Sequence, residues 1–383
     1  MSRRTVLSAG NGAFEAASRR IPQHASRSFS STARNAAVIT HFTPTSSPEL
    51  DTALSTIREK IILPTYLTAQ QQKRIITKKW AKKLQQDPIT IEIDGEVFKF
   101  RHMDPMSGEI PNTRRSVIEA IQKFDAASDD DFKNLRPLLE GVHGAGRQLG
   151  DKFYAKVVRV VGGKGRVAEL VELARSGRKT GFRLDTSEKA NEVLHFIQLG
   201  ALDAAWSRAQ TQQALRWAEL VIDMVEDEAH AAPKATWVEG SLPLSRDPQV
   251  LMAPLHLAAA LVVKAGVQDE KLVAKADRLA GAIVKLWPAD RGLRKIHPVR
   301  SYVEDNQMGY LLDANKFVAL AAPLLHGLGL AQQVVTEPAL AAELKTRYER
   351  LDEEIKSSLA EAAQKGQKGR GDAVYQKFFG GSA

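Results

Sequence analysis

A dense group of positive charges marks residues 73–83. Six cations fall within these eleven residues, interleaved with Ile75, Ile76 and Trp80: Lys73, Arg74, Lys78, Lys79, Lys82 and Lys83. No acidic residue occurs from Thr68 to Gln86, so a helix here can pack its apolar residues and project unneutralised cations together. Such a stripe neutralises phosphates without reading a base sequence. We therefore predict a surface for RNA or another polyanion, the alternative being an ordinary solvated helix face.

Two further basic groups follow later in the chain. One comprises Arg175, Arg178, Lys179 and Arg183. The other comprises Lys365, Lys368 and Arg370, which lie among three glycines. Glycine-rich basic segments are typical of flexible arms that order on RNA, so residues 364–383 are predicted to form a flexible basic tail.

Catalytic and metal-binding patterns are not found in the sequence. The chain has no cysteine, which excludes disulfides, zinc–thiolate sites, iron–sulfur clusters and thiol nucleophiles. Its nine histidines are scattered without metal-ligand spacing, and His195 and His256 are predicted to be core residues. The glycines around Lys164 lack the spacing of a phosphate-binding loop and predict a turn between helices. We therefore predict no enzyme activity, cofactor, metal or small-molecule substrate.

Composition sets the class of protein and its compartment. With 383 residues, 43% of them apolar and 26% charged, the chain is typical of a globular protein, and we predict no membrane span. The net charge is +9, and residues 1–36 contribute strongly, with six arginines against Glu15 alone. This Arg- and Ser-rich segment has the composition of a mitochondrial transit peptide, the alternative being a plain disordered tail. The predicted location is the mitochondrial matrix.

Residues 37–115 must hold the basic group in place. Apolar spacing predicts a helix ending before Pro64 and a second helix over residues 67–84. After it, Ile89, Ile91 and Ile93 alternate with polar residues up to Asp94-Gly95, the signature of a β-hairpin whose second strand covers residues 96–100. A hairpin is marginally stable alone, so its apolar face should dock on the preceding helices.

From residue 116 the pattern is helical. Helices are predicted at residues 116–124, 129–142, 151–161, 166–176, 187–199, 203–229, 248–264, 269–286, 305–325 and 338–363. A constant offset of 35 residues relates six positions, placing Gly165 and Gly200 in equivalent turns. The fold class is therefore mainly α: a helical-hairpin, solenoid-like body over residues 116–363, after a small N-terminal α/β element.

The sequence resembles two known families. Lys189-Ala190-Asn191-Glu192-Val193-Leu194, followed by Gly200, resembles the pentatricopeptide repeat family, which implies stacked helical hairpins. A second resemblance, to fungal proteins associated with the mitochondrial ribosome, rests on four segments: residues 80–84, 87–91, 98–104 and 110–114.

Together with the transit-peptide composition, the basic group, the basic tail and the lack of catalytic motifs, the second resemblance indicates a non-catalytic structural component of the mitochondrial ribosome. We prefer the large subunit. The protein's partners would be ribosomal RNA, through the six cations, and neighbouring ribosomal proteins. The alternative is a helical-repeat factor that binds mitochondrial mRNA during processing or translation.

Overall fold

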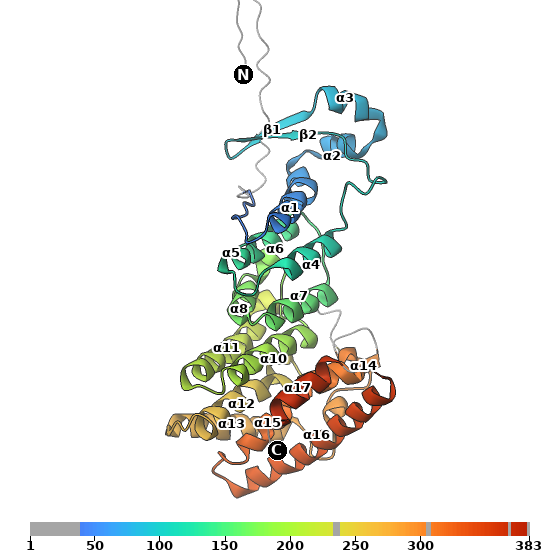
Figure 1. Ribbon diagram of the computed structural model, residues 1–383. Coiled ribbons are helices and arrows are strands. Elements are labelled where there is room, and N and C mark those ends of the chain that lie inside the picture. The colour runs from blue at the N-terminus through green and yellow to red at the C-terminus, as the bar shows by residue number, and fades with distance from the viewer. Residues whose placement is uncertain (1–38, 233–237, 304–307, 367–368, 381–383) are drawn as a thin grey trace, which may run out of the picture. The chain divides into compact units, whose positions relative to one another are not determined.

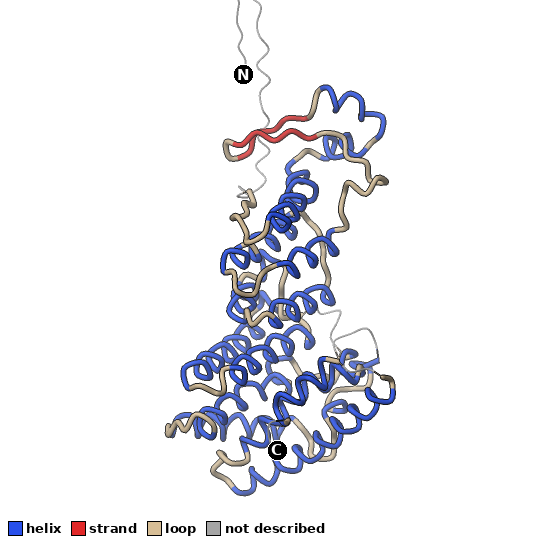
Figure 2. Tube along the Cα trace, viewed as in Figure 1, coloured by secondary structure: helices blue, strands red, loops and turns tan. Residues whose placement is uncertain are grey.

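The computed structural model describes residues 39–232, 238–303, 308–366 and 369–380. Within these ranges the protein is mainly helical with one antiparallel hairpin, which confirms the predicted fold class (Figures 1 and 2). The predicted transit peptide lies outside the described residues.

Helix α1 (Pro48–Ile57) joins the N-terminal element to the main core. It continues into a π-helical turn, η1 (Arg58–Ile62), and a 3₁₀ turn, η2 (Leu63–Tyr66). Leu50, Leu54, Ile57 and Ile61 are buried at helical spacing, and α1 packs on α4 (Thr113–Lys123). The burial of this stripe holds the N-terminal element on the body.

The hairpin forms as predicted. Strand β1 (Ile89–Ile93) pairs with β2 (Glu96–Phe100), with Ile91 opposite Phe98. Asp94 and Gly95 have φ of +49° and +83°, the left-handed values that a tight two-residue turn needs. The isoleucines of β1 and the phenylalanines of β2 pack into a separate hydrophobic cluster with Leu67, Ile75 and Leu84.

The body consists of helix pairs in which consecutive pairs are in contact (Figure 1). Helix α7 packs on α8, α10 on α11, α12 on α13 and α15 on α16, and α10 also contacts α7, α12 and α15. The elements are α5 (Asp129–Lys133), α6 (Leu135–Gly144), α7 (Asp151–Gly163), α8 (Val167–Arg175), α9 (Gly177–Thr180), α10 (Ser187–Asp203), α11 (Arg208–Glu226), η4 (Glu228–His230), η6 (Leu244–Arg246), α12 (Pro248–Val263), α13 (Glu270–Leu286), η7 (Leu293–Lys295), α14 (Arg300–Val303), η8 (Gly309–Leu312), α15 (Ala314–Ala331), α16 (Pro338–Gln364) and α17 (Arg370–Phe379).

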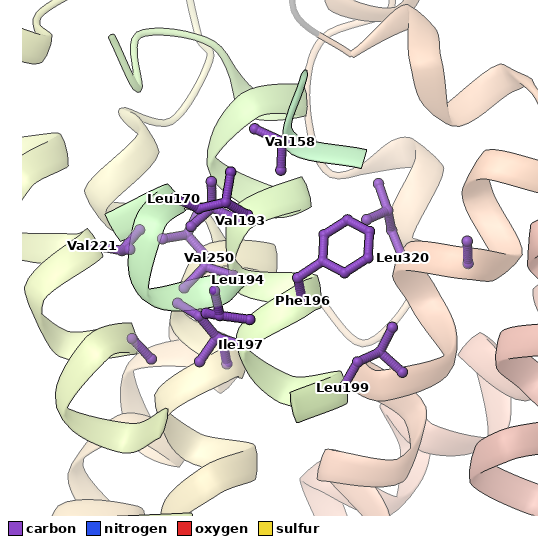
Figure 3. Close-up of a cluster of buried hydrophobic side chains, with 14 of the residues drawn as sticks. Val158, Leu170, Val193, Leu194, Phe196, Ile197, Leu199, Val221, Val250 and Leu320 are labelled. Atoms are coloured by element: carbon purple, nitrogen blue, oxygen red, sulfur yellow. The ribbon is translucent and has the colours of Figure 1, made fainter. Parts of the chain in front are cut away.

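Helix α10 lies at the centre of this core (Figure 3). Val193, Leu194, Phe196 and Ile197 of α10 are buried among side chains from α7, α8, α11, α12 and α15. Polar residues of α10, including Glu192, are buried as well. Each methylene group removed from water contributes about 0.8 kcal/mol, so this helix is a principal source of stability.

The predicted 35-residue repeat, which requires Gly165 and Gly200 to lie in equivalent turns, is wrong. Gly165 does lie in the turn between α7 and α8, with φ of +77°. Gly200, however, lies inside α10, where an added Cβ would meet Val167 of α8 at 3.9 Å. The turn after α10 comes later, at Ala205 and Trp206, whose φ values are +49° and +58°. Burial of the Trp206 indole offsets the cost of this left-handed backbone.

The prediction of a flexible basic tail is wrong for residues 370–379. They form α17, which packs on α15 with Val374 and Phe378 buried. Gly371 N donates to Asn315 Oδ1 at 2.6 Å. An added Cβ at Gly371 would lie only 2.5 Å from the Asn315 carbonyl oxygen, so the two helices approach closely here.

Helix α15 is, among the described helices, long and apolar enough to cross a membrane by length and composition. Of this 18-residue stretch, however, 78% is buried inside the protein. The helix packs against α12, α16 and α17. Its apolar composition therefore matches that of a core helix surrounded by other helices.

Candidate nucleic-acid interface

The predicted single helix over residues 67–84 is wrong. The cations lie instead on α2 (Ala69–Ile76), a 3₁₀ turn η3 (Lys78–Trp80) and α3 (Ala81–Gln86). Thr77, between α2 and η3, is extended. The Ile75 carbonyl oxygen accepts the Met103 N–H at 2.8 Å and lies 2.9 Å from His102 Nδ1. This carbonyl oxygen therefore binds the segment after β2. In a continuous helix it would have to accept the backbone N–H of Lys79 instead.

All six predicted cations are exposed on this surface, which we call the α2–α3 surface: Lys73, Arg74, Lys78, Lys79, Lys82 and Lys83. Two of the three apolar residues between them, Ile75 and Trp80, pack inward as the pattern predicts, whereas Ile76 is 43% exposed. Ile75 and Leu84 are buried in the cluster beneath the hairpin, and Trp80 packs against it. The hydrophobic cluster therefore supports a row of outward-facing positive charges.

Trp80 gathers three of these cations from three different elements. Its ring centroid lies 5.1 Å from Arg74 Cζ, 6.0 Å from Lys79 Nζ and 5.7 Å from Lys83 Nζ. The electron-rich face of an indole attracts cations at these distances. Trp80 therefore keeps three positive charges close together despite their mutual repulsion.

None of the six cations forms an ion pair with a carboxylate in the described part of the chain. The other two basic groups are partly neutralised. Arg175 pairs with Glu172 at 2.9 Å, and Arg183 Nε lies 3.7 Å from Asp185, although Arg178 and Lys179 are exposed and pair with no carboxylate of the described residues. In the third group, Lys365 pairs with Glu361 and Arg370 with Glu192, both at 2.6 Å. The α2–α3 surface thus retains the densest open positive charge that the sequence indicated.

The turn around Lys164 uses its charges within the fold. Lys164 Nζ donates to the carbonyls of Gln122 and Phe124 at 3.1 and 2.5 Å, next to the end of α4. Arg166 Nε donates to Ala126 O at 3.0 Å. These contacts satisfy carbonyl groups at and beyond a helix end, so the turn is structural, as predicted.

The buried histidines are packing residues. His256 Nδ1 lies 2.8 Å from Gln198 Oε1, and His256 Nε2 lies 2.8 Å from His326 Nδ1. Burial lowers the pKa of His256 well below 6.5, and burial reinforced by Lys264 lowers that of His326 to about 4. Trp206 stacks on His326 with ring centroids 5.4 Å apart. His195 is likewise buried, and its pKa is lowered for the same reason.

Metal-binding geometry is not found in the described residues, which contain no group of three or more His, Asp or Glu side chains able to hold an ion. The arrangement at the α2–α3 surface is therefore one of charge alone. It can attract and hold a polyanion.

Comparison with known proteins places these features in a family. Residues 27–377 match the family model described as mitochondrial ribosomal protein mS27. The chain is also 33% identical, over 379 residues and 94% of each chain, to the small ribosomal subunit protein mS27 of Neurospora crassa.

The preference for the large subunit is contradicted by this relative. The resemblance to mitochondrial ribosome-associated proteins and the location in the mitochondrial matrix are confirmed. The chain belongs to the mitochondrial ribosomal protein mS27 family.

Proposed function

We propose that this protein is a non-catalytic structural component of the small subunit of the mitochondrial ribosome. We further propose that the α2–α3 surface contacts ribosomal RNA phosphates. The observation that carries the RNA contact is the set of six exposed cations without a carboxylate partner among the described residues. The name of the Neurospora relative supports assignment to the small subunit.

The surface acts by positioning. Lysine ammonium groups attract phosphates as point charges, and Arg74 can engage one through two parallel hydrogen bonds. Phosphate contacts set the place and orientation of a protein on RNA and carry no base information. Because Ile75, Trp80 and Leu84 already anchor the helices, little backbone freedom remains to be lost on binding.

A structural role also fits the use of the polar residues in the body. A helical-repeat factor that reads RNA bases would present polar side chains of its repeats to a groove. Asn191, which lies in the segment resembling the repeat family, is only 7% exposed. Its Nδ2 donates to Ser187 Oγ at 3.0 Å and lies 3.2 Å from Tyr310 OH. This use of Asn191 in the core argues against the alternative of a repeat-based mRNA factor.

Sedimentation of the tagged full chain on a salt-containing gradient of mitochondrial lysate tests the proposal. We expect co-migration with the small subunit that survives the salt. Co-migration with the large subunit alone would refute the subunit assignment. A slow particle that disappears on ribonuclease treatment would instead favour the free RNA-binding factor.

A further inference from the structure

A second basic feature lies where the loop after α6 meets the start of α4. An open hollow of about 520 Å³ is lined by residues 112–114, at the start of α4, and residues 146–149, between α6 and α7. Both segments belong to the green part of Figure 1. No acidic residue is among those that line the hollow.

Local contacts shape this hollow. Arg114 Nη2 donates to the Gln148 carbonyl oxygen at 3.4 Å, which links the two walls. Gly146 and Gly150 have φ of +71° and +78°, so the second wall turns at both of its ends. Leu149 is buried in the main core and anchors that wall.

Two guanidinium groups make the hollow electropositive. Arg114 and Arg147 are both exposed, and neither forms an ion pair with a described carboxylate. The adjacent Arg115 is different, because its Nε donates to Glu119 at 2.7 Å one helical turn away. The charge of Arg115 is therefore compensated locally, while those of Arg114 and Arg147 are open.

We propose that this hollow is a second RNA-binding site, which seats a phosphodiester of ribosomal RNA between Arg114 and Arg147. The inference rests on the proposed function, since it takes the polyanion to be ribosomal RNA. Guanidinium groups bind phosphate oxygens through paired hydrogen bonds. A hollow of several hundred Å³ has room for a phosphate with its flanking ribose groups. Like the α2–α3 surface, the site contacts the RNA backbone.

The test compares two double variants of the full chain. R114Q/R147Q removes the open charges, and R115Q/R136Q removes two exposed arginines that are paired with Glu119 and Glu140. Binding to transcripts that tile the small-subunit ribosomal RNA is measured across a salt series. We expect R114Q/R147Q to reduce the slope of log K against log salt by about 0.7 to 0.9 per lost contact. R115Q/R136Q should change the slope much less, and R114K/R147K should keep most of it.

The proposed site would be refuted if R114Q/R147Q left the salt slope unchanged, or if the two double variants reduced the slope equally. Variant K78Q/K79Q/K82Q/K83Q, measured beside them, separates this outcome from failure of the proposed RNA contact. If only R114Q/R147Q weakens RNA binding, the proposed site in the hollow is supported and the proposed RNA contact of the α2–α3 surface is refuted. If only the lysine variant weakens binding, the hollow is refuted. Wild-type protein that binds none of the transcripts would overturn both.

Discussion

Two charged helical regions of this protein, α2–α3 and α16, use their lysines in opposite ways. Exposed lysines on α16 and at its C-cap face carboxylates one turn away: Lys345 faces Glu349, Lys356 faces Asp352, and the C-cap Lys365 faces Glu361. On α2–α3 no carboxylate lies within reach in the described chain. Positive residues alone therefore do not identify an RNA surface. The spacing of acidic residues along the helix decides whether the charge remains available.

Deeper in the body, charges serve the fold. Glu192 is fully buried. Its carboxylate accepts two hydrogen bonds from Arg370, at 2.9 and 2.6 Å, and one from Arg159 at 3.1 Å. Lys189 is almost fully buried between Asp151 and Asp185. Buried charges must be paired because each loses its hydration. We therefore expect charge changes in the body to alter stability, and charge changes on the α2–α3 surface to alter RNA binding.

The largest effect should come from removing the open lysines. In K78Q/K79Q/K82Q/K83Q the slope of log K against log salt for ribosomal RNA should fall by roughly 3, at about 0.7 to 0.9 per contact. Helix propensity changes little, so the thermal unfolding midpoint should be retained. The matched control is K133Q/K345Q/K356Q/K365Q, which removes four exposed lysines that are paired with carboxylates. Equal salt slopes in the two variants would contradict the distinction between open lysines on α2–α3 and paired lysines elsewhere.

The next largest effect concerns Glu192. Glu192→Gln leaves Arg159 and Arg370 beside a neutral amide in a buried site and should reduce the free energy of unfolding by about 3 kcal/mol. Urea denaturation of the full chain measures this loss. Lys377→Gln, which removes a half-exposed pair between α17 and Asp203, is the control and should have little effect. If Glu192→Gln altered the salt slope of RNA binding and left the stability unchanged, the distinction between stabilising charges in the body and RNA-binding charges on the α2–α3 surface would be wrong.

A smaller effect should follow from acidification of the body. The folded-state pKa of His326 is about 4, below the ordinary 6.5, so the unfolded chain binds more protons between these values. His326 should therefore lower the free energy of unfolding as the pH drops from 6.5 towards 4, by about 1 to 2 kcal/mol at pH 5, in addition to the losses from His195 and His256, whose pKa values are also lowered by burial. Urea denaturation at pH 7 and pH 5 measures it. His326→Asn, which retains a donor toward His256, should flatten the dependence. An identical pH dependence in this variant would refute the assignment.

The smallest effect should come from Trp80. Trp80→Leu keeps all six cations but removes the ring that gathers Arg74, Lys79 and Lys83. We expect RNA affinity to fall about two- to fivefold, since exposed cation–π contacts contribute about 0.5 to 1 kcal/mol. The salt slope should stay near that of wild type, and Trp80→Phe should recover part of the affinity. A slope reduced as strongly as in the lysine variant would show that the surface had unfolded.

Local features could be predicted from the sequence because they depend on neighbouring residues. Asp94-Gly95 specifies the hairpin turn, and the alternating isoleucines specify which face of β1 is apolar. The cation group and its lack of acidic neighbours are also properties of consecutive residues. For the same reason the stripe of α16 was predictable, with Leu344, Leu351 and Ile355 buried at helical spacing.

Tertiary structure decided the features that depend on residues distant in the chain. Asn134 Oδ1 accepts the N–H of Thr43 at 2.8 Å, and the predicted helix over residues 129–142 is divided at Asn134 into α5 and α6. The engagement of Ile75 by Met103 likewise ends α2, and Glu192 holds Arg370 across 178 positions. The hollow at Arg114 and Arg147 joins two segments more than 30 residues apart. Local propensities specify helices and turns, whereas helix ends, docked segments and shared sites form only when the folded chain brings distant polar groups together.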